Sequence, residues 1–199
     1  MSARLRSVRL RSALVGPFDI EVAAGECIAI TGASGSGKSL FLRLLADLDP
    51  GEGEVFLDDV ERSTMPAPAW RRQVAYVAAE SGWWFDTVAA HFPDLPAARA
   101  LAPALDLKPE LFDGLVLRLS TGEKQRLALI RSLLPGPKAL LLDEPTGALD
   151  EASQAAVETL LRQHLARGCA IVLVTHQPAQ AARLGQRRFV MQAGKLMPA

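Results

Sequence analysis

The segment GASGSGKS, at residues 32–39, constrains the fold more than any other part of the sequence. It matches the pattern G-x-x-x-x-G-K-[S/T] and follows a nearly all-apolar run at 26–32, which predicts a buried strand. Apolar residues at helical spacing then predict a helix over 38–48, ended by DPG at 49–51. In this context, successive backbone N–H groups of a glycine-rich loop can wrap phosphate oxygens. The sequence therefore predicts a phosphate-binding loop, with Lys38 as the cation for the outer phosphates.

The remainder of the chain alternates apolar, strand-like runs with segments of helical periodicity. Strands are predicted at 18–22, 53–59, 73–78, 138–144 and 169–176, helices at 120–134, 149–168 and 177–185, and a closing hairpin at 187–197. This alternation is typical of an α/β domain with a mainly parallel central sheet. The 199 residues suffice for one substantial core, so a single domain over 1–199 is expected. Residues 85–118 are rich in Ala and Pro and show only weak helical periodicity.

Composition narrows the classes of partner. Lys plus Arg equals Asp plus Glu, 22 each, so the whole chain carries no charge bias toward nucleic acid. The Arg-rich start, MSARLRSVRLR, is interpreted as the solvated side of an edge strand, with a local basic patch as the alternative. No apolar run reaches the length of a membrane-spanning helix or of a signal peptide. Cys27 and Cys169 each begin an apolar run and are expected to be reduced core residues.

Two further predicted strands end in candidate catalytic side chains. ALLLDEP, at 139–145, ends in two carboxylates, which alone would also suit a turn. With a phosphate loop upstream, Asp143 is predicted to hold Mg²⁺ through water and Glu144 to polarise the attacking water. His176 ends the strand-like run 172–176 at the ligand edge of a parallel sheet, so we expect it to contact the γ-phosphate, with a structural role as the alternative.

The segment LSTGEKQRLALIRSLL, at 119–134, begins a helix in a way that has two interpretations. Ser120 and Glu123 form the capping-box pattern. The same start, Ser120, Thr121 and Gly122, also has free backbone N–H groups and a hydroxyl, and the glycine lets a ligand come close to the backbone. Together these features make an anion-binding site. Both interpretations can hold at once.

In this order, GASGSGKS, LSTGEKQRLALIRSLL, LLLDEPTGALD and VLVTH resemble the ATPase subunit of ATP-binding cassette (ABC) transporters over essentially the whole chain. The LSGGQ-like segment is the specific mark, because many NTPases share the other motifs. The compact size is similar to small stand-alone subunits such as the iron-export type, which favours export over import slightly. The resemblance implies a P-loop NTPase fold with an N-terminal antiparallel β subdomain and a small helical subdomain at about 80–134.

The resemblance also implies ATP and Mg²⁺ as cofactors and a head-to-tail dimer. Ser120, Thr121, Gly122 and Glu123 would face a nucleotide held by the partner's phosphate loop, and Asp150 would lie near the subunit junction. Lys38, Glu144 and His176 are the expected catalytic residues, with Ser39 and Asp143 at the metal. The expected ATP-binding loop consists of Gly32, Ala33, Ser34, Gly35, Ser36, Gly37, Lys38, Ser39 and Leu40.

Three positions depart from the family pattern. Ala79 stands where a glutamine usually contacts Mg²⁺ and the attacking water, and the adjacent Glu80 could reach the metal only if the loop shifts by one residue. No convincing adenine-stacking aromatic precedes the phosphate loop, since Phe18 reads as a core residue and Tyr76 is the only tyrosine. Thr121 adds a Cβ where the family has glycine.

The leading hypothesis is ATP hydrolysis that powers a transporter whose permease is a separate polypeptide. The subunit would be cytoplasmic, on the inner face of the cell membrane, and would pair with a second copy or another ATPase subunit. SGWWFDTV, at 81–88, reads equally as core packing or as a surface groove for a helix of the permease. The alternatives are a soluble ABC protein acting on DNA or ribosomes, and a regulatory ATP-binding module with impaired hydrolysis.

Overall fold

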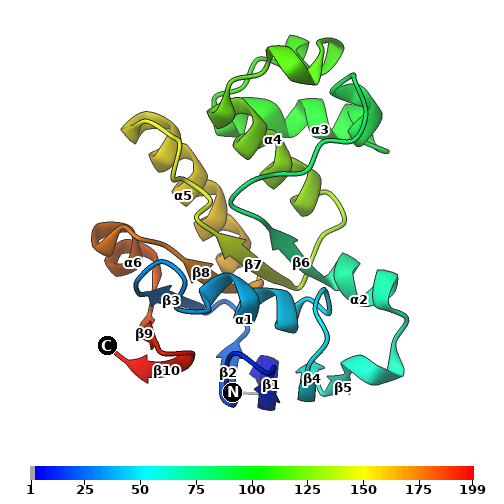
Figure 1. Ribbon diagram of the computed structural model, residues 1–199. Helices are drawn as coiled ribbons and strands as arrows, with labels where there is room; N and C mark the ends of the chain where they lie inside the picture. Colours follow the sequence, from blue (N-terminus) through cyan, green and yellow to red (C-terminus); the bar gives the residue numbers. More distant parts are fainter. Residues whose placement is uncertain (1–2) are drawn as a thin grey trace.

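A six-stranded sheet forms the centre of the computed structural model, which describes residues 3–199 (Figure 1). Its strand order is β10-β9-β3-β8-β7-β6, and all neighbouring strands are parallel except β10, which is antiparallel to β9. The strands are β3 (Cys27–Thr31), β6 (Val74–Val77), β7 (Ala139–Asp143), β8 (Ala170–Val174), β9 (Arg187–Gln192) and β10 (Lys195–Pro198). Every residue of β7 and β8 is buried, as expected of central strands covered on both faces. The predicted mainly parallel sheet is confirmed.

A second, four-stranded antiparallel sheet has the order β2-β1-β4-β5. Its strands are β1 (Ala3–Arg11), β2 (Phe18–Ala23), β4 (Glu52–Leu57) and β5 (Val60–Glu61). The Arg-rich β1 pairs on both sides, so its prediction as an edge strand is wrong. Leu5, Ser7 and Leu10 are buried, and the register shift between Ser7 and Leu10, where Arg9 has a φ of 49°, interrupts the alternation of buried and exposed residues. Alternation reports which face of a strand is buried, but it does not report which strands lie beside it.

Residues 3–199 contain six α-helices. They are α1 (Lys38–Leu45), α2 (Ala67–Gln73), α3 (Leu95–Leu101), α4 (Thr121–Leu133), α5 (Glu151–Ala166) and α6 (Pro178–Leu184). Helix α1 lies between the two sheets and contacts strands of both, whereas α4 and α5 cover the opposite face of the central sheet (Figure 1). Helix α1 ends before the predicted Leu48, because Asp47 adopts a left-handed φ of 58°.

The Ala- and Pro-rich segment forms short turns around α3. Four 3₁₀ helices, Ala89–His91, Ala102–Leu105, Pro109–Asp113 and Val116–Arg118, surround it. Prolines at helix starts and a left-handed Asp106 keep these helices short, which explains the weak periodicity of the sequence. Figure 1 shows these turns, in green, grouped with α3 and α4 away from the antiparallel sheet. The small helical subdomain is therefore present, while its limits at about 80–134 stay a prediction.

Two other sequence predictions concern the core and the membrane. Cys27 and Cys169 are free and buried, and burial raises their pKa to about 12 and about 11, so both stay protonated thiols at neutral pH. Within residues 3–199, no helix combines the length and apolarity that a bilayer crossing requires.

Candidate functional site

The phosphate loop joins β3 to α1, and its glycines are required by its shape. Gly35 and Gly37 have φ values of 73° and 106°. A Cβ at Gly37 would lie 2.4 Å from Cγ1 of Val15, whereas the space beside Gly35 is open to 4 Å. Lys38 Nζ donates hydrogen bonds to the carbonyl oxygens of Gly32 and Ala33, each at 2.8 Å, and the residue is 5% exposed. The loop is thus an open cradle of backbone with a cation at its centre, which fits a phosphate group.

Glu144 is fixed at the carboxyl end of β7 by its backbone. It adopts a left-handed φ of 49°, its N–H donates to the Val174 carbonyl at 3.0 Å, and its own carbonyl accepts from Gln125 Nε2 at 2.6 Å. Gln125 was not singled out from the sequence, because a glutamine on a helix gives no signal of its own. A non-glycine residue in this region of φ is strained and is held there by its surroundings. The Glu144 side chain reaches the residues that follow β8.

Glu144 and His176 meet at that edge of the sheet. The Glu144 carboxylate accepts the backbone N–H of His176 at 3.1 Å, and its other oxygen lies 3.4 Å from His176 Nε2. That second oxygen is buried and has no hydrogen-bond partner in the described chain. Burial raises the pKa of Glu144 above its ordinary value, against the lowering effect of His176. A half-buried carboxylate with one free oxygen and a raised pKa has the properties of a general base.

Oxygen donors for a metal lie beside this pair. Asp143 ends β7 with 4% exposure and accepts a hydrogen bond from the Tyr76 hydroxyl at 3.1 Å. Ser39 is exposed at the start of α1. A hydroxyl and a carboxylate suit Mg²⁺, which binds few protein oxygens and keeps several waters. The donor set therefore fits Mg²⁺ held together with a nucleotide. Sequence reasoning did not find the Tyr76 contact, which depends on the register of β6 against β7.

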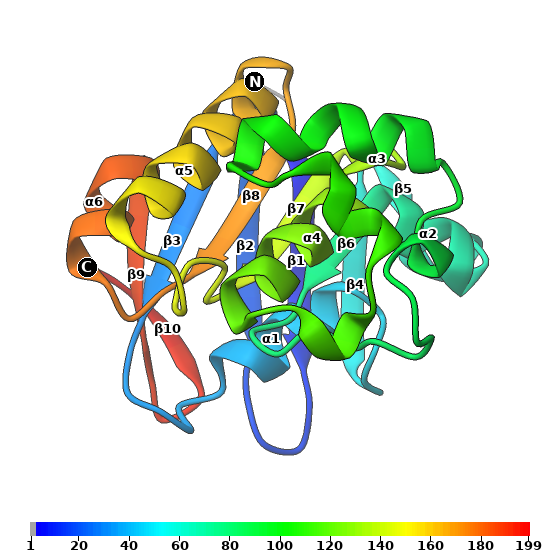
Figure 2. The same ribbon diagram turned by 90° about the horizontal axis from the view of Figure 1, so that it is seen from above.

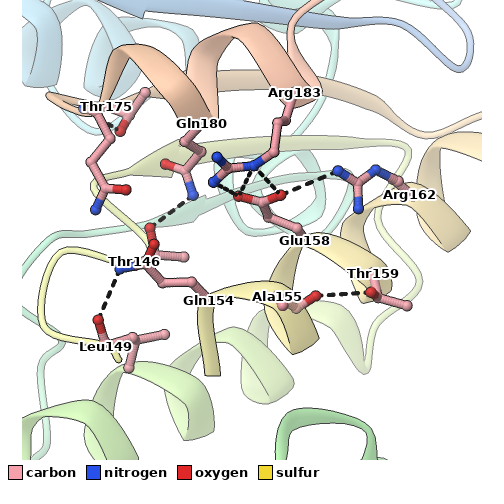
Figure 3. Close-up of polar contacts among 11 residues, drawn as sticks. Thr146, Leu149, Gln154, Ala155, Glu158, Thr159, Arg162, Thr175, Gln180 and Arg183 are labelled. Carbon is pink, nitrogen blue, oxygen red and sulfur yellow. Dashed lines mark hydrogen bonds and ion pairs between the residues drawn. The ribbon is translucent and has the colours of Figure 1, made fainter. Parts of the chain in front are cut away.

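The loop between β7 and α5 is tied to the two neighbouring helices (Figure 3). Gln180 of α6 donates to the Thr146 hydroxyl at 2.8 Å, and Gln154 of α5 donates to the Leu149 carbonyl at 2.8 Å. Asp150 caps α5 by accepting the Ser153 N–H at 2.8 Å. Behind them, the buried Glu158 pairs with Arg183 at 2.6 Å and with Arg162 at 3.2 Å, as Figure 3 shows. The loop thus has a fixed position relative to the strand end that carries His176.

The start of α4 has the predicted capping box. The Ser120 hydroxyl accepts the Glu123 N–H at 3.2 Å, and Glu123 Oε2 accepts the Ser120 N–H at 2.8 Å. Ser120 and Thr121 are exposed. Gly122 packs on the loop after β7, where a Cβ would lie 3.1 Å from Leu149 Cδ2. Figure 1 and Figure 2 both show the start of α4 apart from the loop between β3 and α1. One chain therefore holds the two anion sites at separate places.

The positions that depart from the family pattern lie beyond β6, in the core and at the start of α4. Ala79 and Glu80 lie beyond β6 and are both exposed. Phe18 is a core residue, 1% exposed and 4.5 Å from the Phe41 ring. The phosphate loop borders a cavity of about 540 Å³. Its remaining lining comes from Leu14, Val15, Ala193 and Gly194. Sequence reasoning missed these residues, because only the fold brings the β1–β2 and β9–β10 turns beside the loop.

The aromatic segment is partly core and partly surface. Trp83 is half-buried against the core, whereas Trp84 and Phe85 are 63% and 51% exposed. All three rings pack edge-on against the buried His91, whose Nε2 accepts the backbone N–H groups of Trp84 and Phe85 at 3.0 and 3.1 Å. Arg131 lies over both tryptophan rings. The core-packing interpretation therefore applies to Trp83, whereas a contact of the exposed rings with a permease stays a prediction.

Comparison with known proteins gives the family. The ABC transporter family model matches residues 15–147, more than half of the chain. An aliphatic sulfonates import ATP-binding protein of Paracoccus denitrificans is 36% identical, over 91% of this chain and 72% of the relative. A vitamin B12 import ATP-binding protein of Citrobacter koseri is 34% identical, over 92% of this chain and 79% of the relative.

A solved structure supports the fold. A dimeric ATP-binding cassette in a post-hydrolysis state, bound to ADP and phosphate, superposes with a TM-score of 0.83 over 98% of both chains, at 24% identity. This likeness shows the P-loop NTPase fold with its two sheets and helical subdomain. The chain therefore belongs to the ABC transporter family, as an ATP-binding domain that hydrolyses ATP to power transport.

Proposed function

We propose that this domain is the ATPase subunit of a transporter whose permease is a separate polypeptide, and that it works on the inner face of the cell membrane. The two relatives named above are ATP-binding proteins of import systems. The main support for ATP hydrolysis is the contact between Glu144 and His176 beside the phosphate loop. That pair disfavours a purely regulatory module with impaired hydrolysis. The direction of transport, for which the iron-export resemblance favours export, stays a prediction.

The catalytic roles follow from the positions of the side chains. The cradle around Gly35 would hold the phosphates, and Lys38 would exchange its two loop carbonyls for phosphate oxygens. Bound Mg²⁺, at Ser39 and Asp143, would neutralise charge that develops on the phosphates. Glu144 would accept a proton from the attacking water, and His176 would hold that carboxylate in place and contact the γ-phosphate.

A second copy would complete each site. The exposed start of α4, with Ser120 and Gly122, would close over a nucleotide held by the partner's loop, and Asp150 would lie near the junction. The separation of the two anion sites within one chain supports this arrangement. An isologous pair then contains two composite sites related by a two-fold axis.

Adenine would lie in the cavity beside the loop, on Leu14 and Val15. Leu14 is 80% exposed, and Val15 lines the same cavity. Aliphatic side chains provide apolar contact but no ring stacking, so the base would be held more weakly than on an aromatic side chain.

Replacing Leu14 by tryptophan is expected to strengthen ATP binding by about 5-fold to 150-fold, because stacking on a base contributes ~1–3 kcal/mol. Calorimetric titration with ATP measures the change. The matched control is Val60→Trp, which changes an exposed valine of β5 in the antiparallel sheet. If Leu14→Trp binds ATP no better than Val60→Trp, adenine does not lie at Leu14.

The permease would contact the exposed aromatic surface. Trp84 and Phe85 lie close to the exposed Leu117, because the Val116 N–H donates to the Asp86 carbonyl at 2.8 Å and Thr87 pairs with Leu115. Exposed apolar side chains grouped in this way often mark a protein contact.

The test is co-purification of the membrane protein encoded or expressed with this chain. Trp84→Ser is expected to lower the recovered permease at least about tenfold, since exposed aromatics commonly anchor interfaces. Val60→Ser, at another exposed apolar residue, is the control. Equal recovery with Trp84→Ser would exclude this surface, and recovery of no membrane protein by the unaltered chain would contradict the separate permease.

A further inference from the structure

Asp143 has a hydrogen-bond donor on the adjacent strand. Tyr76, the only tyrosine of the chain, donates its hydroxyl to Asp143 Oδ2 at 3.1 Å. Tyr76 lies on β6 in register with Leu141 of β7, two residues before Asp143. The phenol therefore reaches along the sheet toward its carboxyl edge, where the catalytic groups lie.

This hydrogen bond matters because Asp143 is 4% exposed. A buried ionised carboxylate needs donors, and a bond to a charged group is stronger than one between neutral groups. Among residues 3–199, the Tyr76 hydroxyl is the one side chain that hydrogen-bonds this carboxylate. It occupies Oδ2, so Oδ1 has no side-chain hydrogen bond from the described residues and can serve another ligand.

Tyr76 is also fixed in position. Its ring is held by packing against the core between the central sheet and α1.

The two residues after Ala78 do not hydrogen-bond Asp143 among the described contacts. Ala79 has only a methyl group, and Glu80 is exposed. Tyr76 is the polar side chain of this strand that reaches the metal-side carboxylate.

We propose that Tyr76 is a positioning residue, which orients the Asp143 carboxylate for Mg²⁺ and supplies from β6 the polar contact that Ala79 lacks. This inference rests on the proposed metal role of Asp143. Tyr76 acts through Asp143 and does not itself bind the metal.

The experiment measures the binding of Mn²⁺ to the protein in the presence of a non-hydrolysable ATP analogue. Mn²⁺ is a paramagnetic substitute for Mg²⁺, so electron paramagnetic resonance reports how much of it is bound. Tyr76→Phe keeps the ring and removes the hydroxyl. We expect its Mn²⁺ dissociation constant to rise about tenfold, the effect of losing a hydrogen bond to a charged group. The affinity of Tyr76→Phe for the ATP analogue without metal, measured in excess EDTA, should stay within about twofold of that of the unaltered protein, since the hydroxyl does not touch the nucleotide. Ser132→Ala, which removes a hydroxyl bonded to Ala128 in α4, is the control and should change neither quantity.

A double-mutant cycle distinguishes an effect of Tyr76 through Asp143 from an effect of Tyr76 on the packing of the core. Asp143→Asn alone should weaken Mn²⁺ binding, and adding Tyr76→Phe to it should weaken binding no further, because the two residues act as one unit. Additive losses, an unchanged Mn²⁺ constant in Tyr76→Phe, or a parallel loss of metal-free analogue binding would each overturn the proposal. Failure of the unaltered protein to bind Mn²⁺ with the analogue would instead contradict the proposed function.

Discussion

Glu144→Gln is expected to lower steady-state ATP hydrolysis by about 10²-fold to 10⁴-fold, the usual contribution of a general base, while ATP still binds. The amide is nearly the shape of the carboxylate and can accept the His176 N–H, so the site should keep its geometry. Without hydrolysis, the ATP-bound dimer should accumulate. Phosphate release and size-exclusion chromatography with ATP measure the two effects.

The control for this variant is Glu54→Gln, an exposed glutamate of β4, which should hydrolyse ATP at the normal rate. If the unaltered chain already accumulates as an ATP-bound dimer without turnover, the regulatory alternative is correct.

The raised pKa of Glu144 also predicts a pH dependence. Hydrolysis needs the ionised carboxylate, so activity should fall on acidification at a pH above the ordinary value of 4.5. A carboxyl group with a raised folded-state pKa stabilises the fold below its unfolded-state pKa and loses that contribution as pH rises through the folded-state value. Glu144→Gln should therefore raise Tm at neutral pH and lose this advantage in acid.

Ser120→Asp is expected to lower ATP-dependent dimer formation and hydrolysis at least about 100-fold. Aspartate is as good an N-cap as serine, so α4 and its capping box should persist. Its negative charge would face the partner's γ-phosphate, and like charges brought together at an interface cost several kcal/mol. Sedimentation with ATP and phosphate release measure both losses.

Ser120→Asn is the matched control, because it keeps the cap and the side-chain size without the charge. It should lose much less activity than Ser120→Asp. Equal losses of dimer formation and hydrolysis in the two variants would indicate that the hydroxyl, and not charge repulsion, decides dimer formation. No loss in either variant would contradict a contact between Ser120 and the nucleotide.

The sequence predicted the elements whose residues carry local signals. The phosphate loop, the capping box at Ser120 and the strand ending at Asp143 all lie where expected, because each depends on a glycine pattern, a cap pattern or an apolar run within a few residues. The neighbours of β1 were not predicted correctly, since β4 reaches it only after α1 has crossed between the sheets.

The contacts that position the site were less predictable, because they join segments far apart in the chain. Tyr76 and Asp143 are separated by 67 positions, and only the register of β6 on β7 brings them together. Leu14 approaches the phosphate loop through the β1–β2 turn, and His91 is central to the aromatic cluster although nothing in its sequence context distinguishes it. Such pairs need the topology, which periodicity does not give.

Mixing two inactive variants tests directly whether each active site is shared between two copies. Lys38→Ala loses the phosphate-loop cation but keeps Ser120, and Ser120→Asp keeps Lys38. In a mixed antiparallel dimer one site has both intact groups, so an equimolar mixture should recover up to about one quarter of normal hydrolysis, since half the dimers are mixed. A mixture that hydrolyses no more ATP than its two components measured separately would contradict the account.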